Sequence, residues 1–523
     1  DGGMIRAHTA ATVREAEEPL LAAGEPLMAR AACALTTEVA RELRARGNRV
    51  SGSSVLLLVG GGNNGGDALH AGAHLARRGC QVRAALLTDR PHPAGLSAAR
   101  DAGVRLHHVL QAEDVAGAVL DLAGRADVWV DGLLGIGARG GLREPLAGAV
   151  AALAEERAAW PVEPLVLAVD VPSGIGVDDG TIPGPVLPAD VTVTMGTAKP
   201  GLLLPPAAGL AGRVEVVDLG LGLDALAPAA CTLTATDVAD LLPVPGPEDH
   251  KYTRGVLGIA AGSHAYPGAA ALTATGALRT GLGMIRYLGP EVPTGLVRTR
   301  HPEVVTVPGR VQAWVLGPGT APDDAARMEE LAEHLGEAAR TGVPAALDAG
   351  GLALLHEETE LTGPAVLTPH AGELAQLLTA RGEAVTREEV SAAPARHARL
   401  AAEITGGTVL LKGATTVVAA PHGPLYAQHD ATPWLATAGS GDVLAGVLGA
   451  LLASYGDVIA DGGDVLAGLP ATLAATAAFL HGRAARLAAG LPAEPAPTAG
   501  AGVPITATDV ADALPAALRT IPR

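Results

Sequence analysis

The sequence predicts an α/β protein whose parallel sheets are covered by helices on both faces. Two observations indicate this fold class. Short runs rich in Val and Leu alternate along the chain with longer Ala-rich stretches of helical periodicity. The short runs are apolar throughout, which is typical of strands buried on both faces of a sheet. Several of these runs also end in a glycine-rich or acidic loop, where ligands bind in folds of this class.

Length and composition limit the function classes. A chain of 523 residues is long enough for two or three domains, each with its own core. The net charge of −18 and the 2% aromatic content exclude a nucleic-acid-binding protein, and the three separated cysteines exclude a disulfide framework. The apolar run 443–453 is too short to cross a membrane and predicts a buried helix. We therefore expect a cytoplasmic protein with no membrane partner. We also expect a homo-oligomer, on which composition and apolar patterning give no information.

The first half of the chain predicts one parallel sheet. Residues 9–47 have helical periodicity, and strand-like runs then alternate with Ala-rich segments. The predicted strands are VLLLV (55–59), VRAALL (82–87), VWV (128–130), LVLAV (165–169), VTVTM (191–195) and VEVV (214–217).

A glycine-rich loop follows the first of these strands, and two interpretations of it are open. Gly60, Gly62 and Gly65 fit the dinucleotide fingerprint G-x-G-x-x-G, and Asp89 stands close to where a dehydrogenase has its ribose-binding acid. However, the loop continues as Asn-Asn-Gly-Gly-Asp (63–67), which puts polar side chains where the fingerprint needs only close backbone approach. These side chains favour a polar cradle for a substrate over a cofactor site.

Three predicted strand ends in the first half carry an aspartate: Asp67, Asp131 and Asp170. Any one of them could simply cap a helix or turn, but the carboxyl ends of parallel strands meet at a single edge. The loop 135–141 adds backbone N–H groups suited to a phosphate. The side-chain oxygens of Asn64, Asp131 and Ser173 could hold an alkali cation.

The segment 241–255 has three prolines and a charge cluster, and we expect a linker or a domain entry there. A second α/β pattern follows it. The predicted strands and their loops are VLGIAAG (256–262), AWVLGPG (313–319), PAALDAGG (344–351), AVLTPHAGE (365–373) and TVLLKGATT (408–416).

The motif TAGSGDVLAGVLGALLA (437–453) is the most specific in the chain. Its glycines open a long predicted helix, whose N–H groups and dipole attract an anion. Asp442 lies in the first turn, where a carboxylate can take the proton of a hydroxyl that attacks a phosphoryl group. Lys412 ends another predicted strand, in a polar turn suited to a nucleotide phosphate or ribose, and His370 lies at a further strand end on the ligand-binding edge.

The motifs GNNGGD (62–67), VDGLLGIG (130–137), AVDVPSG (168–174) and MGTAKPG (195–201) resemble the epimerase domain of the NAD(P)H-hydrate repair enzymes. The resemblance implies a Rossmann-like three-layer domain that interconverts the epimers of hydrated NADH and NADPH. It implies a potassium ion on Asn64, Asp131 and Ser173, and Asp170 is our candidate for the proton-handling group. Lys199 could contact substrate or form a structural salt bridge. The implied substrate contacts are Asn63, Asn64, Gly65, Gly66, Asp67, Gly135, Ile136, Gly137, Ala138, Arg139, Gly140, Gly141 and Asp170.

The second half resembles the ADP-dependent NAD(P)H-hydrate dehydratase domain, which has a ribokinase-like fold. The resemblance implies phosphate transfer from ADP, with magnesium, to the hydroxyl of the hydrate, followed by loss of phosphate. It implies that Ala269, Gly319, His370 and the catalytic Asp442 contact the hydrate. The implied nucleotide contacts are Lys412, Gly413, Ala414, Thr415, Thr416 and Gly441. The chain departs from the family pattern at Gly350, where an aspartate is usual, and at Thr415, where a glycine is usual.

We therefore predict an epimerase domain at 1–227 and a dehydratase domain at 228–523, acting on hydrated NADH or NADPH and on ADP. One alternative is a Rossmann oxidoreductase fused to a small-molecule kinase. Another is a first half that only binds nucleotide and regulates the second. The polar loop 63–67 together with Asp131 and Asp170 disfavours both alternatives, because a passive binder needs no such set of carboxylates.

Overall fold

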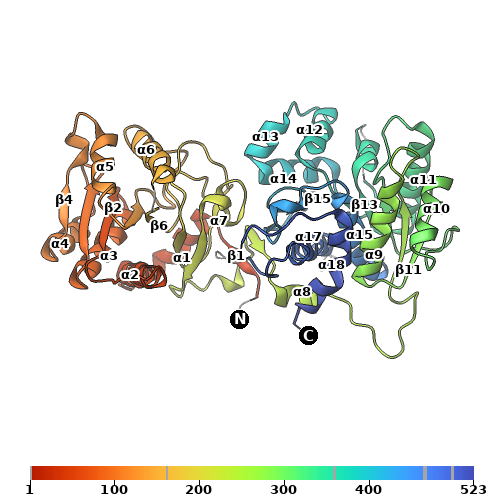
Figure 1. The fold of residues 1–523 in the computed structure, drawn as a ribbon, viewed down its shortest axis with the longest axis horizontal. Coiled ribbons are helices and arrows are strands. Elements are labelled where there is room, and N and C mark those ends of the chain that lie inside the picture. The colour runs from red at the N-terminus through yellow and green to blue at the C-terminus, as the bar shows by residue number, and fades with distance from the viewer. Residues whose placement is uncertain (1–2, 161–162, 357–360, 463–467, 496–499, 523) are drawn as a thin grey trace. The chain divides into compact units, whose positions relative to one another are not determined.

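The computed structural model describes residues 3–160, 163–356, 361–462, 468–495 and 500–522. The chain forms two compact units (Figure 1). The N-terminal unit comprises residues 6–230, and the C-terminal unit comprises residues 231–523 together with 1–5. The division at 230/231 lies three residues after the 227/228 boundary predicted from the sequence.

The N-terminal unit is built on a seven-stranded sheet in the order β4-β3-β2-β5-β6-β7-β8, and its neighbouring strands pair in parallel. The chain order reverses between β2 and β5, so their carboxyl ends form the switch point at which such sheets bind ligands. The strands are β2 (Ser54–Val59), β3 (Gln81–Leu86), β4 (Arg105–His107), β5 (Val128–Gly132), β6 (Leu165–Val169), β7 (Val191–Met195) and β8 (Arg213–Val217).

Helices cover both faces of this sheet (Figure 1). Alternate strand residues such as Leu57 and Val130 pack against α2, α3 and α4, whereas Leu58 and Trp129 pack against α5 and α6. Both sets are fully buried, which explains why the strand sequences show no polar alternation. The helices are α1 (Ala10–Ala22), α2 (Leu27–Ala45), α3 (Asn63–Arg77), α4 (Pro93–Asp101), α5 (Val115–Ala123), α6 (Leu146–Ala159) and α7 (Pro200–Leu203).

The C-terminal unit contains most of a ten-stranded sheet, ordered β1-β9-β17-β16-β15-β14-β13-β12-β10-β11. The strands from β11 to β15 pair in parallel, and β15, β16 and β17 pair antiparallel. The strands are β1 (Ile5–Ala7), β9 (Ala230–Thr232), β10 (Val256–Ala260), β11 (Met284–Tyr287), β12 (Ala313–Leu316), β13 (Ala345–Leu347), β14 (Ala365–Leu367), β15 (Thr408–Leu411), β16 (Thr416–Ala419) and β17 (Leu425–Gln428).

One face of this sheet packs against α9, α15 and α17 through residues such as Val315 and Val366. Trp314 points to the opposite face, where its ring stacks on His334 of α11 with centroids 4.2 Å apart. The main helices are α8 (Ala235–Leu241), α9 (Pro267–Thr280), α10 (Glu291–Arg300), α11 (Ala325–Thr341), α12 (Ala371–Ala380), α13 (Arg387–Ala392), α14 (Pro394–Thr405), α15 (Ser440–Ser454), α16 (Gly456–Asp461), α17 (Leu469–Ala488) and α18 (Ala507–Arg519). The predicted buried helix at 443–453 is the body of α15.

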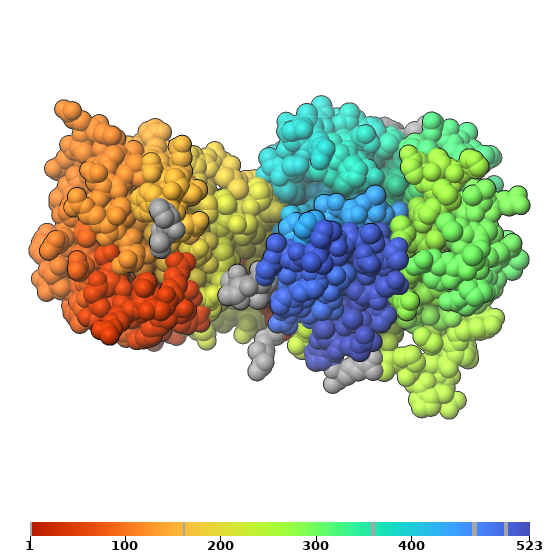
Figure 2. All heavy atoms as spheres, in the orientation of Figure 1, coloured from red at the N-terminus to blue at the C-terminus, as the bar shows by residue number. Residues whose placement is uncertain are grey.

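The segment 241–255, expected from its sequence to be a linker or a domain entry, lies inside the C-terminal unit. The strand β9 and helix α8 precede it, and Cys231 and Val238 already belong to the core of that unit. The segment projects from the unit as an irregular connection to β10 (Figures 1 and 2), with Val244 71% exposed. Its prolines therefore mark a surface loop and not the division between the units.

Within the described ranges, every helix is too short or too polar to span a bilayer.

Two helical glycines offer a matched test of the packing between α9 and α15. A Cβ on Gly446 would lie 2.1 Å from the carbonyl oxygen of Thr273, whereas a Cβ on Gly336 of α11 meets nothing within 4 Å. Gly446→Ala should therefore lower the free energy of unfolding by about 1–3 kcal/mol. Gly336→Ala should raise it by about 0.5–1 kcal/mol, because alanine loses less backbone entropy. Urea denaturation of both variants measures the difference, and equal effects would contradict the close helix contact.

Candidate active sites

The glycine-rich turn after β2 brings three backbone segments into contact at the switch point of the N-terminal sheet. A Cβ on Gly65 would lie 2.1 Å from the carbonyl oxygen of Gly60, and a Cβ on Gly60 would lie 1.8 Å from that of Leu133. The end of β2, the start of α3 and the loop after β5 can meet here only because side chains are absent.

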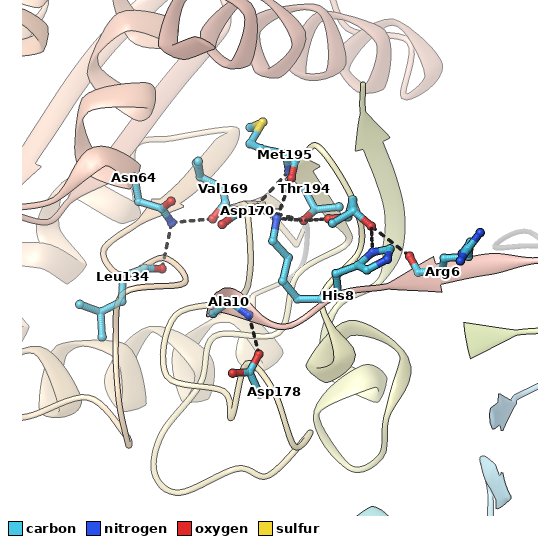
Figure 3. A network of polar contacts seen from close by, with 12 residues as sticks. Arg6, His8, Ala10, Asn64, Leu134, Val169, Asp170, Asp178, Thr194 and Met195 are labelled. Atoms are coloured by element: carbon cyan, nitrogen blue, oxygen red, sulfur yellow. Dashed lines mark hydrogen bonds and ion pairs between the residues drawn. The ribbon is translucent and has the colours of Figure 1, made fainter. Parts of the chain in front are cut away.

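Asn64, Asp131 and Ser173 lie together at this point, as predicted for the cation ligands. The Asn64 amide donates to the carbonyl oxygens of Leu134 and Val169 at 2.9 and 2.6 Å (Figure 3). The Ser173 hydroxyl donates to Asp131 Oδ1 at 2.6 Å, and the Ser173 N–H donates to Asp131 Oδ2 at 2.8 Å. The three side chains therefore join the ends of β5 and β6 to the first turn of α3.

Asp131 is completely buried at this position. Burial raises the pKa of its carboxyl group and outweighs the opposing hydrogen bonds from Ser173 and Leu133. Among the described residues, the ion pairs of the N-terminal unit do not include Asp131. A monovalent cation would compensate this carboxylate, and the oxygen-rich set of donors suits an alkali ion.

Asp170 follows β6 and forms a buried ion pair with Lys199, whose side chain is fully inaccessible. Thr194 Oγ1 and the Met195 N–H also donate to Asp170 Oδ1, both at 3.1 Å (Figure 3). Lys199 in turn donates to Thr194 Oγ1 at 2.9 Å and to the carbonyl oxygen of Met195 at 2.8 Å. The sequence left open whether Lys199 contacts substrate or forms a salt bridge; in the structure it pairs with the candidate proton-handling residue.

The remaining predicted substrate contacts surround this network. Gly65, Gly66 and Asp67 are buried in the first turns of α3, while Asn63 is exposed. The loop 135–141 is irregular and half-exposed, and its first residue lies against Asn64. The loop therefore has accessible backbone beside the polar cradle, as a phosphate site requires.

In the C-terminal unit, Asp442 lies in the first turn of α15, which begins after Gly439 in a left-handed conformation (φ 86°). The first N–H groups of a helix have no acceptor within it, so this turn favours an anion. Burial, followed by the negative charge of Asp348, raises the pKa of Asp442 to about 7, against the opposing charge of Lys412. Asp442 can therefore gain or lose a proton near neutral pH.

Lys412, at the end of β15, lies among carboxylates from two neighbouring strand ends. Its ammonium group donates to Asp348 Oδ1 at 2.8 Å and lies 3.7 Å from Glu373 Oε2. Thr368 Oγ1 donates to the same Asp348 oxygen at 2.7 Å. Burial lowers the pKa of Lys412, but the charges of Asp348 and Glu373 outweigh burial and leave the pKa raised. Lys412 is thus a fixed positive charge beside the α15 N-terminus.

His370 lies at the start of α12 with its side chain exposed. Its Nδ1 atom accepts the N–H groups of Gly372 and Glu373 at 3.0 and 3.2 Å, and Glu373 Oε2 accepts the His370 N–H at 2.8 Å. This reciprocal cap fixes the ring, whose exposed Nε2 atom lies 3.6 Å from Glu373 Oε2.

The other predicted contacts also lie at the carboxyl edge of this sheet. A Cβ on Gly319 (φ 64°) would lie 2.4 Å from Ala269 Cβ, so these two residues are adjacent. Gly413, Ala414 and Thr415 form the turn between β15 and β16, and Gly441 faces the Lys412 ammonium. The space next to Gly350 is filled by the carbonyl oxygen of Thr320, 2.3 Å from where a Cβ would stand.

Three polar residues of these sites were not singled out from the sequence. Asp348 and Glu373 lie within motifs that the sequence does highlight, but their contacts with Lys412 depend on which strands are neighbours. Glu17 of α1 shares the electrostatic environment of Asp170 and Lys199, and it comes from a helix with no motif. Among the described residues, no three His, Cys, Asp or Glu side chains are arranged to hold a metal ion.

Comparisons with known proteins match both units. A family model described as NAD(P)H-hydrate dehydratase matches residues 257–498, and one described as YjeF-related protein N-terminus matches residues 24–201. The chain is 44% identical to a bifunctional NAD(P)H-hydrate repair enzyme of Mycobacterium tuberculosis, over 85% of this chain and 88% of the relative. It is 46% identical to an NAD(P)H-hydrate epimerase of Clavibacter sepedonicus, over 44% of this chain and 96% of the relative.

A solved structure, an ADP/ATP-dependent NAD(P)H-hydrate dehydratase from Bacillus subtilis co-crystallised with ATP and Mg²⁺, covers 57% of this chain and 100% of its own. Its sequence identity is 26% and the TM-score is 0.46.

The buried ion pair predicts a non-additive effect on stability. Lys199→Met leaves the Asp170 carboxylate buried without its cation and should lower the free energy of unfolding by about 3–5 kcal/mol. Adding Asp170→Asn removes that charge, and asparagine tolerates the left-handed conformation at this position (φ 65°). The double variant should therefore recover most of the loss in a denaturation experiment. Additive losses would contradict a direct interaction.

Proposed function

Because this chain belongs to the family of bifunctional NAD(P)H-hydrate repair enzymes, we propose that each unit carries one of the two activities. The protein is an isomerase and a lyase: it interconverts the epimers of hydrated NADH and NADPH and dehydrates the hydrate with ADP. The observation that carries this conclusion is the 44% identity that spans both units. We assign the epimerase to residues 1–227 and the dehydratase to residues 228–523.

For the dehydratase, we propose that the phosphate groups of ADP bind at the N-terminus of α15, with Gly441 and the turn 412–416 as nucleotide contacts. Lys412 lies beside Gly441 and would oppose the phosphate charge. Asp442 accepts the proton of the hydrate hydroxyl while the hydroxyl oxygen attacks the terminal phosphorus of ADP and AMP leaves. Loss of phosphate from the product, together with a proton from the neighbouring ring carbon, then gives NAD(P)H. Ala269, Gly319 and His370 would contact the hydrate.

Magnesium fits this site as a partner of the nucleotide. Since the described residues offer no three-ligand metal site, Mg²⁺ would be held mainly by phosphate oxygens and would neutralise their charge.

For the epimerase, we propose that the segment 63–67 and the loop 135–141 bind the hydrated dinucleotide beside Asp170. Asn64, Asp131 and Ser173 would hold potassium, whose charge compensates the buried Asp131. The cytoplasmic location and the homo-oligomeric state remain predictions. An oxidoreductase fused to a kinase is not favoured, because the matched relatives are named for hydrate epimerisation and repair.

The decisive assay incubates mixed NADH-hydrate epimers with ADP and Mg²⁺ and follows the absorbance of recovered NADH. Consumption of both epimers supports the proposal. If neither epimer is consumed, the proposed function fails, and if only the S epimer is consumed, the epimerase assignment fails.

Asp442→Asn should lower ADP-dependent recovery by about 10²–10⁴-fold, because the proton acceptor is lost. Epimerisation measured without ADP should persist in this variant, and loss of both activities would argue against independent sites.

In the wild type, kcat for dehydration should rise as the pH increases through about 7, because the ionised form of Asp442 is required. A flat profile between pH 6 and 8 would contradict this role.

Potassium should raise the melting temperature of the protein relative to choline at equal ionic strength. The proposed site with its buried Asp131 exists only in the folded state, and an ion that binds only the folded state stabilises it. Ser173→Ala should weaken this response and lower the potassium-dependent epimerisation rate by about tenfold. Dehydration of the purified S epimer is the control. An equal response of wild type and variant to potassium would remove these ligands from consideration.

A further inference from the structure

Three carboxylates from distant parts of the sequence converge in the N-terminal unit. One is Asp170, after β6. Another is Glu17 of α1, which covers the turn after Asp170: the Ala10 N–H donates to Asp178 Oδ1 at 2.8 Å, and Ala10 packs in an apolar cluster with Val171. Glu17 lies one and two turns beyond the buried Val13 and Ala10, on the same face of α1. It is therefore directed inward, towards Asp170.

The third carboxylate is Asp67 of α3. It lies one turn after Asn64, on the same face of the helix, and Asn64 is fastened to the carbonyl oxygen of Val169, the residue before Asp170 (Figure 3). Asp67 is only 7% exposed, and its Oδ1 atom is buried without a hydrogen-bond partner among the described residues. An ionised carboxylate in this position would be uncompensated.

The two aspartates have different polar surroundings. Asp170 has the Lys199 ammonium group and two further donors on one oxygen. Asp67 has none of these, and burial, followed by the charges of Asp170 and Glu17, raises its pKa to about 8. Burial and the charge of Asp170 also raise the pKa of Glu17, against the charges of Lys199 and Arg14. The His92 ring lies against Gly66, and the ring of His70, one turn after Asp67 on α3, meets it edge-on with centroids 6.2 Å apart.

We propose that Asp67 is a second catalytic residue of the epimerase site, the proton donor, and that Asp170 is the matching proton acceptor. The proposal rests on the epimerase function proposed above. It assigns Asp67 a chemical role beyond substrate contact, and it assigns Glu17 the role of a positioning residue that keeps Asp67 protonated. A neutral acid beside an ionised base is the arrangement that a reversible proton-transfer reaction needs.

The epimerised carbon of the hydrate carries a hydroxyl group and is bonded to the ring nitrogen. Asp170 takes the hydroxyl proton, the oxygen electrons form a carbonyl, and the carbon–nitrogen bond breaks. The electron pair of that bond goes to the nitrogen, which takes the proton of Asp67. Rotation about the neighbouring carbon–carbon bond exposes the other carbonyl face, and the same two transfers in reverse close the ring. No atom is gained or lost, and both aspartates return to their starting states.

The test uses the full chain, whose dehydratase activity serves as an internal control. Asp67→Asn should lower the rate of R-to-S interconversion, measured chromatographically without ADP, by about 10²-fold or more. ADP-dependent dehydration of purified S epimer should stay within about twofold of wild type, which shows that the variant is folded. Epimerisation by Asp67→Asn at the wild-type rate would overturn this proposal alone. Failure of the wild type to interconvert the epimers would overturn the proposed function and this proposal with it.

The pH dependence separates a proton donor from a structural residue. The wild-type epimerisation rate should fall as the pH rises through about 8, because protonated Asp67 is lost. Glu17→Gln removes one of the charges that raise this pKa, so the decline should move to lower pH while the plateau rate is kept. Superimposable profiles for wild type and Glu17→Gln would overturn the role of Glu17, and a wild-type profile that is flat up to pH 9 would overturn that of Asp67.

A measurement without substrate completes the test. The pKa of Asp67 is higher in the folded protein than its ordinary value of 3.8. Protonated Asp67 therefore contributes fully to the stability of the folded protein below about pH 4, and this contribution is lost as the pH rises through about 8. Asp67→Asn has no such dependence, so its melting temperature relative to wild type should increase over this range and level off above it. A difference that does not change with pH would show that Asp67 is ionised throughout, and would overturn the proposal.

Discussion

Burying a carboxylate at the edge of an apolar sheet costs free energy unless a positive charge or a proton compensates it. Both units of this chain face that constraint. In the N-terminal unit Lys199 compensates Asp170, and in the C-terminal unit Lys412 compensates Asp348. Each pair joins two strand ends or loops that are far apart in the sequence, so the geometry of both sites depends on it.

The two ion pairs also determine the chemistry of their neighbours. Next to each paired aspartate lies a second aspartate without a cation of its own, Asp67 in one unit and Asp442 in the other. In both cases burial is the first cause of the raised pKa and the charge of the paired aspartate is the second. In the roles that we propose, one electrostatic arrangement would serve opposite purposes: Asp67 would donate a proton and Asp442 would accept one. The pKa is about 8 for Asp67 and about 7 for Asp442, so the protonated form of Asp67 and the ionised form of Asp442 both predominate between pH 7 and 8.

Much of the fold could be predicted from the sequence, because parallel strands are short apolar runs and their carboxyl ends share one edge. The run 55–59 is β2 from Ser54 to Val59, and 165–169 is β6 without change. The grouping of Asn64, Asp131 and Ser173 follows from the same rule. Glu17 could not be found this way, because its helix has no motif and its orientation depends on tertiary packing. The proline-rich segment 241–255 was misleading, since prolines mark irregular backbone wherever it occurs and do not identify domain boundaries.

The departure at Gly350 shows how far residue type alone can be used. The sequence indicates a missing carboxylate, but the structure shows that the Thr320 carbonyl oxygen occupies the space a Cβ would need. The backbone segments that follow β12 and β13 thus approach each other more closely here than a side chain at Gly350 would allow. The negative charge near the α15 N-terminus comes from the carboxyl groups of Asp348, Glu373 and Asp442. The residue at position 350 contributes none of it. Asp348 and Glu373 therefore surround Lys412 although position 350 carries no carboxylate.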